Sequence, residues 1–325
     1  MYNFGLHIPI PMDFTLKKWA QNVLWRLALR RYYWAIKLLA RPKFIKKHKR
    51  WPRNPASSRA TFEDYIFRRM TGPFTAFEET CVDKEQAKSS AVALSPGLLT
   101  ARTLSILPLS PDTTLDQVGV FLHPFLGKNL VAKPTHTSGG IVFLGIPDLK
   151  AIVQQTFVMF QFAKQNFFFN EYETQYLGLK PKIIVEECLP SAATPGKSGS
   201  GYHPPPDFRF YSSRGKVLFC QYDEGRFADH RQALFTVPEH RHIPIADLFP
   251  SPDPLPEKPA HWDEMLRRSS DLSKPFDFVR VDLYDLPEGV YFSEFTFTPN
   301  ATLFPFRDKA FSRKLLEDVL RASGK

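Results

Sequence analysis

The stretch FVRVDLYDLPEGVYFSEFTFTP, residues 278–299, decides the fold of this 325-residue chain. Apolar residues alternate with polar ones on both sides of the turn at 286–289, which predicts two strands joined in a hairpin. The hairpin brings Asp282 and Glu294 close together in otherwise apolar surroundings. Two carboxylates in a half-buried site repel each other unless a cation lies between them, and oxygen ligands of this kind suit Mg²⁺. The pattern predicts a magnesium site, with two solvent-facing carboxylates on a polar sheet face as the alternative.

The composition is that of a globular chain, with 43% hydrophobic residues and enough length to bury a sizeable core in two or three lobes. Cys81, Cys188 and Cys220 are odd in number and lack CxxC spacing. They indicate a reducing compartment, with neither a disulfide framework nor a zinc site. Charges interrupt the first apolar run, so no secretory signal is expected, and no apolar run reaches the 18 residues of a membrane span.

The net charge of +10 is unevenly distributed. Between Phe14 and Phe62 there are fourteen Lys or Arg and no Asp or Glu, which leaves 29 basic against 33 acidic residues elsewhere. All the excess positive charge therefore belongs to one N-terminal segment.

This segment has the pattern of an amphipathic helix that carries tryptophan. Its apolar residues at helical spacing are Leu16, Trp19, Ala20, Val23, Leu24 and Leu27. The opposite, basic face carries Lys17, Lys18, Arg26 and Arg30. With Trp19, the segment holds four tryptophans, the others being Trp25, Trp34 and Trp51. Such helices are typical of membrane interfaces, where each basic residue contributes about 1 kcal/mol near anionic lipid. We expect residues 14–53 to bind an anionic membrane surface. The alternatives are packing on the protein or a partner, a basic arm for nucleic acid, and a mitochondrial-type targeting peptide. Nothing elsewhere resembles a nucleic-acid module, so a nucleic-acid partner is not expected.

From residue 61 onward the pattern predicts alternating helices and strands. Helices are expected at 61–77 (capped by Thr61 or Ser58 and ending at Gly72-Pro73), from Asp83-Lys84 through Ala91, at 148–179 and at 262–272. Strands are expected at 130–134, 141–144, 182–185, 207–211 and 217–222, and loops at 96–128, 191–206 and 244–259.

The small residues of Thr135-His136-Thr137-Ser138-Gly139-Gly140 lie between two of these strands. Backbone amides in such a hairpin loop can fold over an anion. The loop is not a Walker A motif, because GxxxxGK[ST] is missing and no helix follows the glycines directly. An ordinary glycine turn is the alternative.

The order of Asp83-Lys84, AKPTHTSGG (132–140), IIVEECL (183–189) and RVDLY…SEFTFTP (280–299) resembles the ATP-grasp superfamily. More narrowly, it is similar to the teichuronopeptide-biosynthesis (TupA-like) branch associated with bacterial surface polysaccharides, over roughly residues 63–310. The resemblance implies an α+β ATP-grasp fold, in which two α+β lobes grip ATP between antiparallel sheets. The expected division is a basic amphipathic segment (1–62), an N-terminal lobe (63–128), a small lobe with the glycine loop (129–190) and a large lobe with the metal site (191–325).

The resemblance also implies roles for individual residues. Lys84 and Lys133 correspond to lysines that contact ATP phosphates, and the amides of Ser138, Gly139 and Gly140 would cover them. The hinge residues Glu186, Glu187 and Leu189 correspond to the adenine contacts, and Asp207 to a ribose contact. Arg209 and Arg226 are candidates for phosphate or acidic-substrate contacts, with surface salt bridges as the alternative.

The metal site matches best. Asp282 and Glu294 correspond to the two Mg²⁺ carboxylates, and Arg280 to the arginine that stabilises the acyl-phosphate transition state. Many relatives have Asn where this chain has Thr296, whose hydroxyl ligates Mg²⁺ less strongly. Asn300 stands where glycine is usual, and it tolerates left-handed backbone angles.

The implied function is that of an ATP-dependent carboxylate–amine ligase that uses ATP and Mg²⁺ and forms an amide through an acyl-phosphate. Arg280, Arg226 and Lys133 would act on the reacting groups by positioning and charge neutralisation. The carboxylate substrate would be a uronic acid or amino acid on a glycan precursor, by family analogy alone. An ATP-grasp kinase and a non-catalytic nucleotide-binding scaffold are the alternatives. The expected location is the cytoplasm, peripheral on the inner face of the cytoplasmic membrane where the N-terminal segment binds it.

Overall fold

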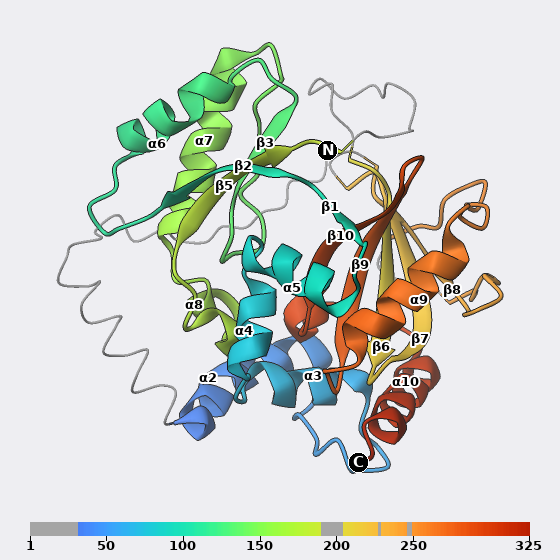
Figure 1. The fold of residues 1–325 in the computed structure, drawn as a ribbon. Helices are drawn as coiled ribbons and strands as arrows, with labels where there is room; N and C mark the ends of the chain where they lie inside the picture. Colours follow the sequence, from blue (N-terminus) through green and yellow to red (C-terminus); the bar gives the residue numbers. More distant parts are fainter. Residues whose placement is uncertain (1–31, 190–203, 227–228, 246–248) are drawn as a thin grey trace.

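Two antiparallel sheets with helices on their faces form the molecule (Figure 1). The computed structural model describes residues 32–189, 204–226, 229–245 and 249–325. The expected α+β class with two sheet-bearing lobes is confirmed. The predicted amphipathic stretch at residues 16–30, with Trp19 and Trp25, lies outside the described residues, as does most of the predicted loop at 191–206.

The large sheet has six strands in the order β1-β10-β9-β6-β7-β8, antiparallel except where β1 pairs with β10. Its strands are β1 (Leu99–Thr100), β6 (Asp207–Ser213), β7 (Lys216–Glu224), β8 (Arg231–Phe235), β9 (Val279–Leu286) and β10 (Gly289–Thr296). The predicted hairpin at 278–299 is therefore confirmed as β9–β10.

The small sheet has four strands in the order β2-β5-β3-β4. They are β2 (Thr103–Pro108), β3 (Leu130–Pro134), β4 (Val142–Phe143) and β5 (Lys182–Glu187). Alternation along β3 and β5 sends Ala132, Ile183 and Val185 into a core with α6 and α7. Lys133 and Glu186 consequently point to the opposite face.

The helices cover both sheets. Their bounds are α2 (Tyr33–His48), α3 (Phe62–Met70), α4 (Ala76–Val82), α5 (Gln86–Leu94), α6 (Leu115–Leu122), α7 (Leu149–Lys164), α8 (Phe168–Glu171), α9 (Trp262–Ser273) and α10 (Lys309–Ala322), with short 3₁₀ turns η1 (His123–Phe125), η2 (Thr174–Tyr176) and η3 (Pro299–Thr302). On the large sheet, α5 and α9 share a core with Phe210 and Val281, whereas α3 and α10 pack on Tyr211 and Phe278 from the other side. Beyond the part that α3 and α10 cover, the residues that alternate with the α5/α9 core on this second face are polar, among them Arg209, Asp223 and Asp282.

The basic segment is in part a packed helix. Along α2, Ile36, Ala40 and Phe44 are buried against Phe67, Phe168 and Leu177. The alternative of packing on the protein therefore holds for residues 33–48. Among the described residues, no helix is both long and apolar enough to cross a bilayer.

Several element predictions need correction. Thr61 caps α3 as expected, with its amide 2.9 Å from Asp64 Oδ2, but α3 ends at Met70 and a separate helix, α4, follows. The predicted loop at 96–128 contains β1, β2 and α6, and the predicted helix at 148–179 breaks into α7, α8 and η2. β8 and α10 have no counterpart among the predictions, although the helical spacing of Phe311, Leu315 and Val319 in α10 is a signal that could have been used.

The proposed lobe boundaries stay a prediction. β2 comes from the range 63–128 but pairs with β5 in the small sheet, and β1 from the same range pairs with β10.

Candidate active site

The register of the β9–β10 hairpin places Asp282 directly opposite Glu294. A β-bulge between Phe292 and Glu294 inserts Ser293, and this extra residue shifts the alternation. Phe292 and Phe295 both enter the α5/α9 core, while Glu294 turns to the polar face beside Asp282. With strict alternation after Phe292, Glu294 would point into the core. The bulge therefore assembles the predicted carboxylate pair.

Arg280 lies between these oxygen groups. Its Nη2 is 2.6 Å from Asp282 Oδ2, 3.1 Å from Glu294 Oε1 and 3.0 Å from Thr296 Oγ1, and its Nε is 2.7 Å from Asp282 Oδ1. The expectation that a cation separates the carboxylates is met here by a guanidinium. Only 1% of the Asp282 side chain is exposed, against 36% for Glu294, which excludes the alternative of two solvent-facing groups.

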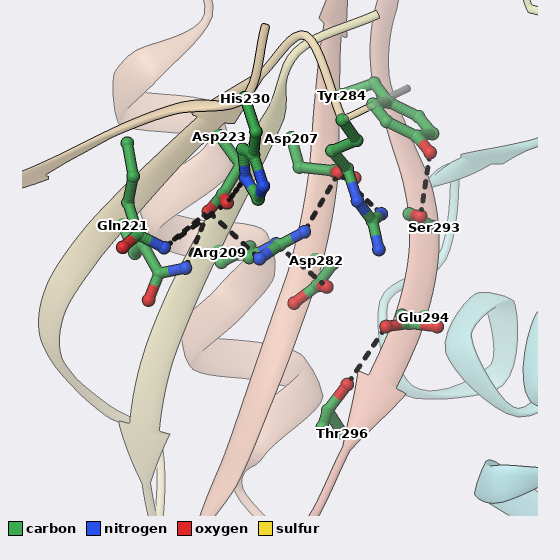
Figure 2. Close-up of polar contacts among 12 residues, drawn as sticks. Asp207, Arg209, Gln221, Asp223, His230, Asp282, Tyr284, Ser293, Glu294 and Thr296 are labelled. Atoms are coloured by element: carbon green, nitrogen blue, oxygen red, sulfur yellow. Dashed lines mark hydrogen bonds and ion pairs between the residues drawn. The ribbon is translucent and has the colours of Figure 1, made fainter. Parts of the chain in front are cut away.

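The expectation of apolar surroundings is wrong, because the polar face of the large sheet carries a network of charged side chains (Figure 2). Arg209 Nε is 3.6 Å from Asp282 Oδ2, and the same guanidinium pairs with Asp223 at 3.0 Å and Asp207 at 3.2 Å. Arg226 Nη1 lies 2.9 Å from Asp207 Oδ2. The predicted residues Asp207, Arg209 and Arg226 therefore all belong to the site.

The charged side chains around Glu294 determine its ionisation. Burial by itself would raise the pKa of this carboxyl, but the positive charges of Arg280, Lys84, Arg226 and Arg209 outweigh it and lower the pKa to about 2. Glu294 is thus a carboxylate surrounded by cations from the large sheet and from the segment before α5.

Asp207 retains unused hydrogen-bonding capacity. Its Oδ2 accepts from Arg209 and Arg226, whereas its buried Oδ1 has no hydrogen-bond partner among the described residues. A buried acceptor without a donor is costly, so Oδ1 is suited to accept a hydroxyl or amino hydrogen from a ligand.

The small sheet contributes ammonium groups. Lys133 forms an ion pair with Glu186, and Lys88 Nζ is 2.5 Å from the second oxygen of the same carboxylate. Burial opposes ionisation, yet these two lysines hold the pKa of Glu186 below its usual value. Glu186 therefore pairs with two lysines in the structure, and the adenine contact that the family resemblance implied stays a prediction.

Lys84 lies before α5, and its ammonium hydrogen-bonds to the Thr137 carbonyl of the glycine loop. Burial lowers the pKa of Lys84 to about 8; Glu294 acts in the opposite direction and Lys133 in the same one. Lys84 thus interacts both with Lys133 of the small sheet and with Glu294 of the large sheet.

The glycine loop has the backbone that its sequence requires. Gly139 and Gly140 have φ of 97° and 75°, and a Cβ on Gly140 would come within 3.1 Å of Phe162. Ser138 and Gly139 are exposed. His136, by contrast, is buried, and its Nε2 lies 3.0 Å from the Ala163 carbonyl of α7. This contact attaches the loop to α7.

The remaining hinge residues hold the lobes together. The Glu187 carboxylate accepts from the Arg102 amide at 2.8 Å, and Leu189 packs with Ala101 and Leu286. Asn300 adopts φ of 59°, which confirms the left-handed conformation expected of it.

Lys88, Asp223 and His230 lie in this constellation although sequence reasoning did not single them out. Lys88 follows Lys84 by one helical turn, and Gln221 and Asp223 alternate with apolar residues along β7. Both are signals that could have been used. Nothing in the sequence pairs His230 with Asp223.

Comparison with known proteins places this geometry in a family. The model of the TupA-like ATP-grasp family matches residues 102–320, about two thirds of the chain. No curated protein is significantly similar to the chain in sequence.

Among solved structures, the chain is similar to the VanG D-Ala:D-Ser ligase from Enterococcus faecalis (12% identity, TM-score 0.44, covering 75% of this chain and 62% of that one). It is also similar to D-alanine–D-alanine ligase from Bacillus anthracis complexed with ATP (16%, 0.40, 75% and 65%) and to the ATP-grasp ligase PsnB complexed with a minimal precursor (13%, 0.38, 77% and 62%). The chain thus spans somewhat less than two thirds of the length of these structures. On the strength of the family match, the chain belongs to the TupA-like ATP-grasp family.

Proposed function

We propose that this protein is an ATP-dependent carboxylate–amine ligase that forms an amide through an acyl-phosphate. The observation that supports this most is the convergence of Asp282, Glu294 and Thr296 on Arg280, with Lys84, just before α5, acting on Glu294. Oxygen ligands for a metal and fixed cations for phosphates are the groups that phosphoryl transfer requires.

The donor set fits Mg²⁺. Three oxygens surround one point of positive charge, the Nη2 atom of Arg280. In the described part of the chain, no group of three or more His, Cys, Asp or Glu could hold a metal ion. A cation held here by two carboxylates would be completed by phosphate oxygens. Asp282, Glu294 and Thr296 would hold Mg²⁺ once the Arg280 guanidinium, which lies between these oxygens, moves away from them, and the ion would then neutralise charge on the transferring phosphate.

For the nucleotide, we assign the phosphates to Lys84, Lys133 and the amides of residues 138–140. Lys133 and Lys88 share Glu186, so a phosphate would compete with that carboxylate for Lys133. The free Oδ1 of Asp207 is assigned to a ribose hydroxyl, and the backbone of Leu189 at the hinge to adenine.

Two arginines serve the reacting groups. Attack of the substrate carboxylate on the γ-phosphate builds negative charge, which Arg280 and Arg226 would neutralise. This chemistry needs no covalent nucleophile, so Cys188 is not assigned a catalytic role.

For the acceptor we propose a uronic acid or amino acid on a glycan precursor, joined to an amine. Membership in the TupA-like family and the cationic site, which suits an acidic substrate, support this assignment.

The test is ADP release from Mg²⁺-ATP against a panel of uronates and amino acids, with hydroxylamine present to trap an acyl-phosphate. Carboxylate-dependent ADP release with hydroxamate is the expected result. ADP release without hydroxamate would favour a kinase, and nucleotide binding without ADP release would favour a scaffold; either result would contradict the ligase.

We also propose that the basic N-terminal region binds an anionic membrane surface, placing the enzyme at the inner face of the cytoplasmic membrane. On α2 the side opposite the core exposes Trp34, Leu38 and Leu39, and the described residues 32–53 hold eight Lys or Arg and no acidic residue. An apolar stripe beside concentrated positive charge is complementary to anionic lipid.

A further inference from the structure

A second lysine lies beside the proposed phosphate lysine Lys133 and is fixed by the protein. The Lys88 ammonium on α5 is 2.5 Å from Glu186 Oε2. It also donates to the Ala101 carbonyl at 2.7 Å and to Thr103 Oγ1 at 2.9 Å. An ammonium has three hydrogens, so these three acceptors occupy all of its donors. Lys88 is therefore held in one position and has no donor left for a ligand.

Lys133 shares the same carboxylate but is less constrained. Its ammonium pairs with the other oxygen of Glu186, and within the described residues this is its one ion-pair partner. Two of its three donors remain for a ligand, and its side chain is more exposed than that of Lys88. Of the two lysines on Glu186, Lys133 is thus the one that can turn to a phosphate.

The charge balance of Glu186 requires one of these lysines to stay. Glu186 is 4% exposed, and a buried carboxylate that loses its counter-ions is costly. Burial by itself would raise the pKa of Glu186, but Lys133 and Lys88 hold it below its usual value. Burial in turn lowers the pKa of Lys88, and the charge of Glu186 opposes this. When a phosphate draws Lys133 away, Lys88 is the cation that remains on the carboxylate.

The third lysine of the proposed phosphate site favours this exchange. Lys84 precedes Lys88 by one helical turn, and its ammonium donates to the Thr137 carbonyl of the glycine loop. Burial lowers the pKa of Lys84, and the positive charge of Lys133 adds to this effect, so the two ammonium groups repel each other. An anion between Lys84 and Lys133 would relieve the repulsion.

We propose that Lys88 is a positioning residue of the nucleotide site, which stays on Glu186 as its counter-ion and so releases Lys133 to the ATP phosphates. The inference rests on the proposed nucleotide site and adds to it the residue that makes Lys133 available. Without Lys88, Lys133 would be the sole counter-ion of Glu186. Turning Lys133 to a phosphate would then leave the buried carboxylate unpaired, so ATP would bind without this contact.

The contribution of the phosphates can be measured as the dissociation constant of adenosine divided by that of ATP. Calorimetric titration gives both constants, with adenosine measured in competition with ATP. In Lys88→Met this ratio should fall by about tenfold or more, because Lys133 stays on Glu186. The matched control is Lys150→Met, which removes the same charge from an exposed lysine of α7 and should keep the parent's ratio.

Removal of the carboxylate separates positioning from a general loss of structure. In Lys88→Met combined with Glu186→Gln, Lys133 is free again and the ratio should return to the parent's value. Any contact of Glu186 with adenine affects both ligands alike and cancels in the ratio. Adding Lys133→Ala to the double variant should lower the ratio again by about tenfold, which would assign the restored affinity to Lys133.

Two results would overturn the positioning role. One is a parent-like ratio in Lys88→Met, and the other is a lowered ratio that Glu186→Gln does not restore. If Lys88→Met proves too unstable to measure, the double variant decides, because it contains no unpaired carboxylate; a ratio well below the parent's would then contradict the proposal. In each of these cases ATP binding by the parent would still uphold the nucleotide site. A parent that does not bind ATP would contradict the nucleotide site and this inference together.

Discussion

At the residue scale, the polar face of the large sheet depends on opposite charges that are each too buried to stand alone. Asp282 is held by Arg280 and Arg209, and Glu294 by Arg280 with the more distant Lys84. Removing one member of a buried ion pair leaves an uncompensated charge, so conservative amide substitutions are the appropriate probes.

Asp282→Asn and Glu294→Gln should each lower the rate of ADP release by about 10²-fold or more, because a metal ligand supplies several kcal/mol of charge stabilisation. Steady-state ADP release at saturating Mg²⁺-ATP measures this. Glu288→Gln, at the exposed turn of the same hairpin, is the matched control and should behave like the parent. Parent-like turnover in both site variants would place the chemistry elsewhere.

Lys133→Ala should weaken ATP binding by about tenfold or more, because a charge-assisted phosphate contact is lost. The melting temperature without nucleotide should change little, since Lys88 still pairs with Glu186. Calorimetric titration with ATP and thermal melting check the two parts. A large fall in melting temperature with unchanged ATP affinity would show that Lys133 is structural.

The buried carboxyl of Glu173, which is not one of the proposed metal ligands, should make the stability of the protein depend on pH. It is buried, accepts from Thr298 Oγ1 and Gln175 Nε2, and burial raises its pKa to about 7. The folded state therefore binds a proton that the unfolded state has lost above its own pKa of about 4.3, and stability falls as pH rises from there through about 7.

Glu173→Gln should remove this loss of stability at high pH. Between pH 5 and pH 8, its free energy of unfolding should improve relative to the parent by roughly 3 kcal/mol. Urea unfolding at the two pH values measures the difference. Glu317→Gln, an exposed carboxyl on α10, serves as the control; a parent and Glu173→Gln with the same pH trend would refute the assignment.

At the element scale, α2 has apolar residues on two opposite sides. Ile36 and Phe44 attach it to the body, and its outer side is apolar without being covered by the described residues. Deleting residues 1–53 would expose Phe67 and Phe168, so truncation would destabilise the protein and could not isolate membrane binding.

Point substitutions on the outer side avoid this problem. Leu38→Ser combined with Leu39→Ser should weaken binding to phosphatidylglycerol-containing vesicles, because less apolar area enters the interface. Flotation with vesicles and the blue shift of Trp34 emission measure it, and added salt should reduce binding in the parent. Val153→Ser on α7 replaces a similarly exposed residue and should have no effect. A parent that ignores anionic vesicles at low salt would disprove the membrane proposal.

At the scale of the whole molecule, the proposed nucleotide site draws groups from both sheets. Mg²⁺-ATP should therefore raise the melting temperature, with about 2.7 kcal/mol of added stability at a hundred times its Kd, because it binds only the folded state. Differential scanning calorimetry with and without Mg²⁺-ATP checks this. An unchanged melting temperature together with no heat of binding would contradict a nucleotide site between the sheets.

The sequence by itself determined what depends on local pattern. Alternation and a turn signal specified the β9–β10 hairpin, so the pairing of Asp282 with Glu294 follows from the sequence alone. The Thr61 cap and the glycine loop were predictable for the same reason, because a few adjacent residues set the backbone there.

The tertiary structure alone decided what depends on partners distant in the chain. Simple alternation does not place the bulge at Ser293, since the shift is stabilised by Phe292 and Phe295 entering one core. Glu186 turned to Lys133 and Lys88 because β3, β5 and α5 meet only in the fold. Likewise, α2 could be amphipathic toward lipid or toward protein on pattern alone, and only the packed body shows which side it buries, because burial depends on surfaces that the folded chain creates.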